Sequence, residues 1–357
     1  MKTAAQFSVP YFQFLDARGE LAEPPPGLAL NALIPVYRTM AFTRAFDARA
    51  VALQRTGQLR TFPSSLGEEA ATVGLASVMR AEDVLLPTYR ETGAFLWRGV
   101  TPVEIFLYWA GDERGSCVAG PREDFPISVP IASHCGHATG VAAAFQHRKQ
   151  ARVAVCVVGD GATSKGDFYE AVNLAGIWRL PVVFVVINNG WAISVPAARQ
   201  TACATFAQKA IAGGIPGVQA DGNDAVAVRH VVGQAIERAR SGDGPTVVEL
   251  LSYRLTDHTT ADDARRYRSA EEVSAAWAEE PLVRLRKLLA REGLWAKADE
   301  EALIADNQAR LEAAVAEYLA TPPQPLTSIV DYLYAELPAE LVAQRAELAA
   351  REGGHHG

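Results

Sequence analysis

Hydrophobic and polar residues change their spacing several times in the middle of the chain, and these changes predict a sheet covered by helices. Residues 153–158 and 182–187 are short apolar runs, and residues 167–178 between them have apolar positions at helical intervals. A strand, a helix and a strand within about 35 residues form a βαβ unit with parallel strands. A helix over 225–240 and a buried strand over 245–253 extend the pattern. We therefore expect an α/β fold with a doubly wound, mainly parallel sheet flanked by helices.

The same spacing gives predictions for the two ends of the chain. Residues 31–55 and 68–79 are expected to be helices, and residues 84–87 a short buried strand. The first 30 residues contain three consecutive prolines, which favours an arm that lies on another surface. Ala, Glu, Leu and Arg at helical spacing dominate the end of the chain. We expect three parts, namely an N-terminal arm (1–30), an α/β domain (31–270) and a helical C-terminal extension (271–357).

Composition narrows the class of protein and its partners. The 357 residues include 34 Lys and Arg against 41 Asp and Glu, a net charge of −7, and 49% are hydrophobic, as in ordinary soluble globular proteins. No run of five Lys or Arg occurs, which argues against nucleic acid as a partner. The apolar runs are far shorter than the roughly 20 residues of a membrane span, and the N-terminus lacks the pattern of an export signal. We expect a cytoplasmic protein without membrane contact.

Three features could suggest metal sites or disulfides, and each has a simpler explanation. The four cysteines lack metal-binding spacing and are expected to be reduced and mostly buried. His134 and His137 form an HxxH pair without an evident third ligand. Residues 221–224 could pass for part of a calcium loop, but they lack the downstream Glu and are expected to cap the helix that starts at Ala225.

The most specific pattern of reactive residues follows the two parallel strands. Gly159, Asp160 and Gly161 end the first strand, Asn188 and Asn189 end the second, and 26 residues separate the two motifs. Ligands of open α/β sheets bind outside the carboxyl ends of the strands, so both motifs are expected in one crevice. The glycines allow a phosphate to approach the backbone, and the next helix adds its positive N-terminal field. Carboxylate and amide oxygens beside a phosphate suit Mg²⁺.

Other phosphate motifs do not match this stretch. A dinucleotide fingerprint requires a third glycine where Ser164 stands, and a P-loop that starts at Gly161 requires lysine where Asp167 stands. Either half of the pattern alone fits a plain turn after a strand. Both halves in register on consecutive parallel strands favour a binding site.

The pattern resembles the thiamine diphosphate motif. Residues 159–194 are similar to the α subunit of the E1 component of 2-oxo acid dehydrogenase complexes, and the resemblance extends over about residues 10–345. It implies thiamine diphosphate and Mg²⁺ as cofactors. The implied metal ligands are the side chains of Asp160 and Asn189 and the carbonyl of Trp191. The implied diphosphate contacts of the backbone are Gly161 and Ala162.

Two further segments resemble cofactor-binding segments of this family. Arg90, within Tyr-Arg-Glu-Thr-Gly, would pair with diphosphate oxygens, as expected of a guanidinium fork. Backbone groups near Val129 and Ile131 would hold the aminopyrimidine, and the Ile131 side chain would prop the cofactor in its bent form. His134 stands where the family commonly has Gln. The remaining cofactor-binding residues implied by the resemblance are Tyr89, Gly159 and Ile193.

The third segment supplies the expected catalytic residue. Residues 257–268 are similar to the family's His-Ser-x-Ser-Asp-Asp loop that ends in Tyr-Arg. His258 is the first choice, because a loop histidine with a pKa near neutrality can bond to phosphate or donate a proton to a reacting oxygen. The family uses this histidine near the cofactor during transfer to the lipoyl group.

The resemblance implies an oxidoreductase with a second subunit. The family needs a glutamate from a separate pyrimidine-binding domain, so we expect a β subunit in an α2β2 heterotetramer, with the lipoyl domain of E2 as a further partner. Residues 326–340, with Tyr332, Leu333 and Tyr334, are candidates for covering a partner, as is the N-terminal arm.

The expected reaction is oxidative decarboxylation of pyruvate with reductive acylation of the lipoyl group, because residues 89–93 and 109–115 look like bacterial pyruvate dehydrogenases. The branched-chain 2-oxo acid and acetoin enzymes are close alternatives. A non-catalytic module that binds Mg²⁺ and diphosphate is a more remote alternative. Intact Asp160, Asn189, Arg90 and His258 argue against it.

Overall fold

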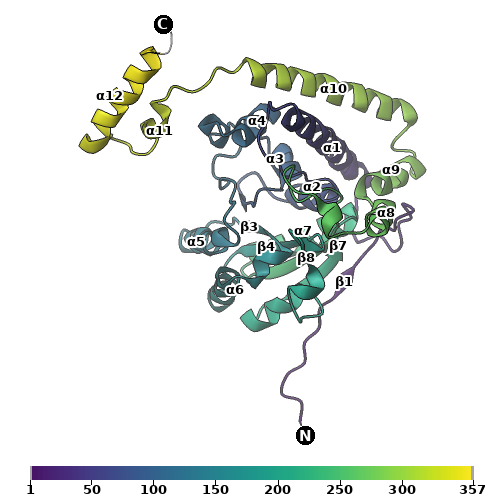
Figure 1. Cartoon of the computed structure of the whole chain (residues 1–357). Helices are drawn as coiled ribbons and strands as arrows, with labels where there is room; N and C mark the ends of the chain where they lie inside the picture. The colour runs from purple at the N-terminus through teal and green to yellow at the C-terminus, as the bar shows by residue number, and fades with distance from the viewer. Residues whose placement is uncertain (1, 355–357) are drawn as a thin grey trace. The chain divides into compact units, whose positions relative to one another are not determined.

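A computed structural model describes residues 2–354. The chain divides into two compact units between Glu312 and Ala313. The first unit contains a six-stranded sheet in the order β1-β7-β8-β4-β3-β2, and every neighbouring pair is parallel (Figure 1). Its strands are β1 (Tyr11–Phe12), β2 (Val84–Leu86), β3 (Ala154–Gly159), β4 (Val182–Asn188), β7 (Gly217–Asp221) and β8 (Thr246–Leu251). The predicted parallel, doubly wound sheet is confirmed.

Helices cover both faces of this sheet (Figure 1). The helices α5 and α6 pack against β3 and β4 on one face, whereas α7 packs on the other and α2 and α1 lie above it. The helices of the first unit are α1 (Leu33–Arg55), α2 (Glu69–Ala76), α3 (Thr92–Trp97), α4 (Pro102–Ala110), α5 (Ser133–His147), α6 (Gly166–Trp178), α7 (Ala225–Arg240), α8 (Ala270–Ala278) and α9 (Pro281–Arg291). A small antiparallel hairpin, β5 (Trp191–Ala192) with β6 (Val195–Pro196), follows β4.

The central strands form where the sequence has its continuous apolar runs. In β3 and β4 all residues but the last are buried, since helices cover both faces of the sheet. The predicted helix over 225–240 has the bounds of α7, and the Asp224 side chain caps it by accepting from the backbone of Val226 and Ala227 at 2.8 and 3.1 Å. The acidic turn before α7 is therefore a helix cap, as predicted.

The predicted N-terminal arm is partly wrong. Tyr11 and Phe12 form an edge strand that pairs with β7, and Leu15 is fully buried beside α1 and α9. The backbone N–H groups of Phe14 and Leu15 each donate to Asp224 Oδ2 at 2.7 Å. The reason is the free edge of β7, whose unpaired backbone groups are satisfied by this segment of the same chain.

The second unit is helical. The long helix α10 (Lys297–Ala320) contains the boundary between the units, and α11 (Ser328–Asp331) and α12 (Ala339–Gly354) follow it. An ion pair of 2.6 Å between Asp331 and Arg345 joins the last two helices. No helix within residues 2–354 is long and apolar enough to cross a membrane. The predicted division at residues 30 and 270 stays a prediction.

The cysteines are divided between the interior and the surface. Cys135 and Cys156 are buried, Cys203 is partly exposed and Cys117 is exposed, and all four are free thiols. The expected burial therefore holds for the first two.

Candidate active site

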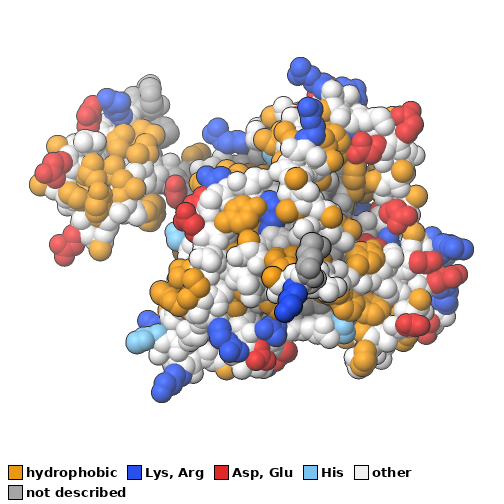
Figure 2. All heavy atoms as spheres, turned by 90° about the horizontal axis from the view of Figure 1, so that it is seen from below, with side chains coloured by type: hydrophobic (Ala, Val, Ile, Leu, Met, Phe, Trp, Pro, Cys, Tyr) orange, Lys and Arg blue, Asp and Glu red, His pale blue; other side chains and the backbone are white. Residues whose placement is uncertain are grey.

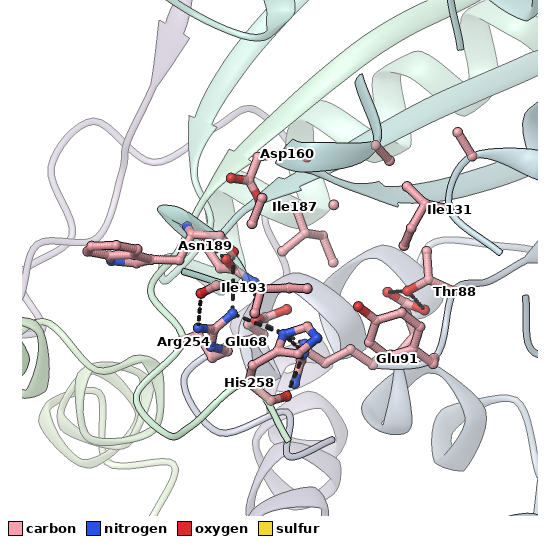
Figure 3. A pocket seen from close by; sticks show the side chains of 18 of the residues that line it. Glu68, Thr88, Glu91, Ile131, Asp160, Ile187, Asn189, Ile193, Arg254 and His258 are labelled. Atoms are coloured by element: carbon pink, nitrogen blue, oxygen red, sulfur yellow. Dashed lines mark hydrogen bonds and ion pairs between the residues drawn. The ribbon is translucent and has the colours of Figure 1, made fainter. Parts of the chain in front are cut away.

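The loops that follow four neighbouring strands meet at one edge of the sheet. Strands β2, β3, β4 and β8 are adjacent and parallel, so their carboxyl ends lie side by side. Tyr89 and Arg90 follow β2, Asp160 follows β3, Asn189 follows β4 and His258 follows β8. These side chains line one cavity (Figure 3). Segments that lie far apart in the sequence thus contribute to a single site.

The structure brings together eleven of the twelve residues predicted to bind the cofactor. They are Tyr89, Arg90, Ile131, Gly159, Asp160, Gly161, Ala162, Asn189, Trp191, Ile193 and His258. The side chain of Val129 is an exception, since Val129 is 52% exposed and does not belong to the lining. The lining is mixed, with apolar isoleucines beside buried charged groups.

Asp160 lies at the start of a 3-10 turn, Asp160–Ser164, directly after β3. Its carboxylate is buried and accepts from Gln200 Nε2 at 2.6 Å, and burial raises its pKa. A Cβ atom at Gly161 would lie 2.7 Å from the Cβ atom of Ala192 in β5, so the turn requires glycine there. The turn is therefore held tightly against the hairpin, with one carboxylate directed to the cavity.

Asn189 is held at both ends of its side-chain amide. Its Nδ2 donates to Glu68 Oε1 at 2.8 Å, and its Oδ1 accepts from the backbone N–H of Trp191 at 3.2 Å. The Trp191 carbonyl, the third predicted metal ligand, accepts from Arg254 Nη1 at 3.3 Å. The three predicted metal ligands thus come from two neighbouring loops, after β3 and after β4.

The opposite wall of the cavity is cationic. Arg90 Nη2 and Arg254 Nη1 lie 3.1 and 3.2 Å from the same nitrogen, Nδ1 of His258. Both guanidinium groups can only donate, so Nδ1 is the acceptor and the neutral ring carries its proton on Nε2. Arg90 Nη2 also donates to the His258 carbonyl at 3.0 Å. The two arginines and the histidine form one hydrogen-bonded group.

The predicted near-neutral pKa of His258 is wrong. Burial of the ring, followed by the charges of Arg90 and Arg254, lowers the pKa of His258 to about 4. The histidine is therefore uncharged at neutral pH. It can accept a hydrogen bond at Nδ1 and donate one from Nε2.

The loop around His258 is fixed by residues of the same sequence motif. Asp262 Oδ2 accepts from the backbone N–H of His258 at 2.9 Å and also from the Tyr267 hydroxyl. Arg268 donates to the Arg254 carbonyl, and its Nη2 donates to the Thr256 carbonyl at 2.6 Å. The acidic, tyrosine and arginine positions of the motif therefore orient the loop and the histidine.

Comparison with known proteins agrees with this geometry. The family model described as dehydrogenase E1 component matches residues 37–326. The chain belongs to this family. It is similar to the 3-methyl-2-oxobutanoate dehydrogenase subunit alpha of Mycobacterium tuberculosis, with 43% identity over 316 residues, which covers 88% of this chain and 86% of the relative. It is also similar to the pyruvate dehydrogenase E1 component subunit alpha of Staphylococcus aureus, with 37% identity over 335 residues, covering 93% and 90%.

Both relatives are α subunits, and this E1 chain is the α type of a 2-oxo acid dehydrogenase complex. The E1 family depends on thiamine diphosphate. The residues of the cavity fit that cofactor. The buried Asp160 carboxylate accepts from a neutral amide, which leaves its negative charge available to a cation. Arg90 and Arg254 form a buried cationic wall that suits a diphosphate.

Sequence reasoning missed several residues of this E1 cavity. Arg254 could have been found, because it directly follows the predicted strand 245–253 and lies three residues beyond the end of β8. Thr88 and Glu91 flank the predicted Tyr89 and Arg90, and the Thr88 hydroxyl lies 2.8 Å from both Glu91 carboxylate oxygens. Burial raises the pKa of Glu91 to about 7. Glu68 had no signal, since the sequence places it at the start of the predicted helix 68–79, and nothing in that pattern indicates a binding site.

His134, where the family commonly has Gln, does not line the cavity. It is buried in α5, and its Nε2 lies 2.7 Å from the Val157 carbonyl in β3. Burial lowers the pKa of His134. The substitution therefore affects the packing of α5 on the sheet rather than the cavity wall.

Proposed function

We propose that the chain uses thiamine diphosphate and Mg²⁺ to decarboxylate a 2-oxo acid and to pass the acyl group to the lipoyl group of E2. One observation carries the proposal. The carboxyl ends of four adjacent strands place an oxygen-rich wall, with Asp160 and Asn189, opposite a cationic wall, with Arg90, Arg254 and His258. A divalent cation bound to a diphosphate needs both kinds of wall in one cavity.

Each wall has its own task in this proposal. Asp160, Asn189 and the Trp191 carbonyl would hold Mg²⁺, and Arg90 with Arg254 would neutralise the diphosphate. The helix α6, which begins at Gly166 shortly after the turn, adds a positive N-terminal field. Thiamine diphosphate, when bound, supplies the electron sink that allows loss of CO2. The protein residues bind and orient it.

His258 would act as a neutral hydrogen-bond donor. Its Nδ1 accepts from two arginines, so Nε2–H is the group left to donate to a phosphate or to a reacting oxygen. Because the pKa of His258 is lowered to about 4, Nδ1 stays unprotonated at neutral pH and remains the acceptor for both arginines. The arginines thereby fix the tautomer of His258 as well as its position.

A β subunit would complete the site. Ile131 and Ile193 line the cavity and are nevertheless 44% and 55% exposed, as expected at the boundary with a partner. In the second unit, Ile329, Tyr332 and Leu333 are more than 60% exposed, and Figure 2 shows hydrophobic side chains gathered on this unit. We propose that both apolar surfaces contact the β subunit of an α2β2 heterotetramer.

For the substrate, we propose 3-methyl-2-oxobutanoate and the related branched-chain 2-oxo acids. The support is the higher identity, 43% against 37%, to the mycobacterial subunit named for that substrate. Pyruvate is the second candidate, on the similarity to the staphylococcal subunit. The pyruvate preference expected from residues 89–93 and 109–115 stays a prediction.

The test measures reduction of an artificial electron acceptor, using the chain co-expressed with its β-type partner. Thiamine diphosphate and Mg²⁺ are added, and pyruvate, 3-methyl-2-oxobutanoate and acetoin are compared by kcat/KM. We expect the highest value for 3-methyl-2-oxobutanoate. A higher value for pyruvate would replace the substrate proposal, and a folded complex that binds the cofactor without any turnover would contradict the catalytic function.

A further inference from the structure

Two consecutive asparagines at the carboxyl end of β4 are each bound by a buried glutamate. Asn188 Nδ2 donates to Glu249 Oε1 at 2.8 Å, and Asn189 Nδ2 donates to Glu68 Oε1 at the same distance. Only one of the two pairs belongs to the cavity, since Asn189 and Glu68 line it whereas Asn188 and Glu249 do not. Glu68 is therefore the candidate for a role in the site, and Glu249 is a matched control outside the cavity.

Glu68 reaches the cavity from a distant part of the sequence. It immediately precedes α2, lies 121 residues before Asn189 and is 2% exposed. Its Oε1 also lies 3.9 Å from Arg90 Nε, and the charge of Arg254 acts on it as well. Glu68 therefore stands between the oxygen-rich wall and the cationic wall, close to both (Figure 3).

The hydrogen bond has a consequence for the orientation of Asn189. A side-chain amide has one accepting end and one donating end, and a Glu68 carboxylate oxygen is the acceptor in this hydrogen bond. Glu68 therefore selects the Nδ2 end of Asn189, and the Oδ1 end must face the opposite direction. An amide turned by 180° would place its oxygen against the Glu68 carboxylate and present N–H groups to a cation.

We propose that Glu68 is a positioning residue that keeps Asn189 Oδ1 available to the divalent cation. This inference rests on the proposed function, in which Asn189 is a metal ligand. Groups that orient a metal ligand from behind commonly change metal affinity by about 10- to 100-fold when they are removed.

The experiment is calorimetric titration of thiamine diphosphate into the cofactor-free α/β complex at increasing Mg²⁺ concentration. For Glu68→Ala we expect the half-saturating Mg²⁺ concentration to rise by about 10- to 100-fold. For Glu68→Gln we expect a smaller rise, because its amide oxygen can still accept from Asn189. The matched control Glu249→Gln should stay within about threefold of the wild type, a change of well under 1.4 kcal/mol.

Exchanging the side-chain types of Glu68 and Asn189 distinguishes a role of Glu68 in orienting residue 189 from a role in protein stability. Asn189→Asp faces the Glu68 carboxylate with a second carboxylate, so we expect weak Mg²⁺ binding. Glu68→Gln combined with Asn189→Asp restores a donor and an acceptor in reversed order, and we expect Mg²⁺ affinity to recover relative to Asn189→Asp alone. A purely structural role of Glu68 would not produce this recovery.

The outcomes distinguish this inference from the proposed function. If the wild-type complex does not bind thiamine diphosphate in a Mg²⁺-dependent manner, the proposed function fails. If the wild type binds but Glu68→Ala has unchanged Mg²⁺ dependence, or if the exchange gives no recovery, Glu68 is not a positioning residue. Should Glu68→Ala fail to fold, the comparison of Asn189→Asp with the exchanged pair decides alone.

Discussion

The two walls of the cavity are built in different ways. The oxygen-rich wall comes from two adjacent strands, and its residues Asp160 and Asn189 follow directly on β3 and β4, whose register is fixed along their whole length. The cationic wall comes from loops after β2 and β8, which are not neighbours in the sheet. Arg90 there donates to His258, and Arg254 donates to the same ring nitrogen. One wall depends on backbone geometry and the other on side-chain contacts.

This difference determines how each wall responds to substitution. In the first wall a ligand atom is lost without any rearrangement of its neighbours, since the strands keep their register. In the second wall each side chain sets the position or the pKa of another, as Arg90 and Arg254 do for His258. Effects in the second wall should therefore be smaller for single residues and coupled to one another.

The largest effect is expected for Asp160→Ala. The variant removes the carboxylate directed to the cation, so Mg²⁺-dependent binding of thiamine diphosphate to the α/β complex should be lost. Asp160 is buried and its pKa is raised, so the protein itself should not be destabilised by the loss of this charge. Calorimetry measures the binding, and thermal unfolding of the cofactor-free complex is the control. Binding of wild-type strength would refute the assignment of Asp160 as a ligand.

A smaller effect is expected for Arg90→Lys. Lysine keeps the charge but lacks the fork that reaches the Ser64 carbonyl at 2.7 Å and His258 at the same time. We expect cofactor affinity to fall by about 10- to 100-fold, or roughly 1.4 to 2.7 kcal/mol, with an unchanged half-saturating Mg²⁺ concentration. A parallel loss of Mg²⁺ affinity would show that the two walls are not separable in this way.

The fold could be predicted wherever a helix or strand has its own regular spacing of hydrophobic residues. The runs 153–158 and 182–187 and the helix 225–240 were placed to within one or two residues of β3, β4 and α7. The edge strand Tyr11–Phe12 was not, because two residues carry no periodicity and their partner in β7 lies about 200 residues further along the chain. Such a strand forms through tertiary pairing alone.

The same distinction applies to the candidate site. The glycines and the two asparagines could be read from spacing, because strand ends fix where their side chains go. Glu68 could not, since its only link to Asn189 is a contact between the start of α2 and the end of β4. The pKa of His258 was misjudged for the same reason, because the burial of the ring and the two neighbouring arginines that lower it depend on tertiary contacts.

His258→Ala should separate transfer from binding in the cationic wall. Arg90 and Arg254 remain to hold the diphosphate, so cofactor affinity should stay within roughly tenfold, about 1.4 kcal/mol. Transfer to a lipoyl acceptor should slow by at least about tenfold, since the Nε2 donor is lost. Rapid-quench measurement of lipoyl acylation against decarboxylation tests this. Equal rates of acylation in variant and wild type would exclude a catalytic role for His258.

The smallest effect on the function of the site is expected for Glu91, which changes the pH dependence of stability. Burial raises the pKa of Glu91 from 4.5 to about 7, so between these pH values the folded protein binds a proton that the unfolded chain does not. The free energy of unfolding therefore falls as pH rises through this range. Glu91→Gln mimics the protonated form. Its stability relative to the wild type should therefore increase from about pH 4.5 to about pH 7, by at most about 3 kcal/mol, and stay level above pH 7. Thermal unfolding of the cofactor-free complex between pH 5 and pH 8 measures this difference, with the exposed Glu301→Gln as a control that should follow the wild type. A constant difference across this range would show that Glu91 stays ionised, and that the hydrogen bonds from Thr88 and the charge of Arg90 offset its burial.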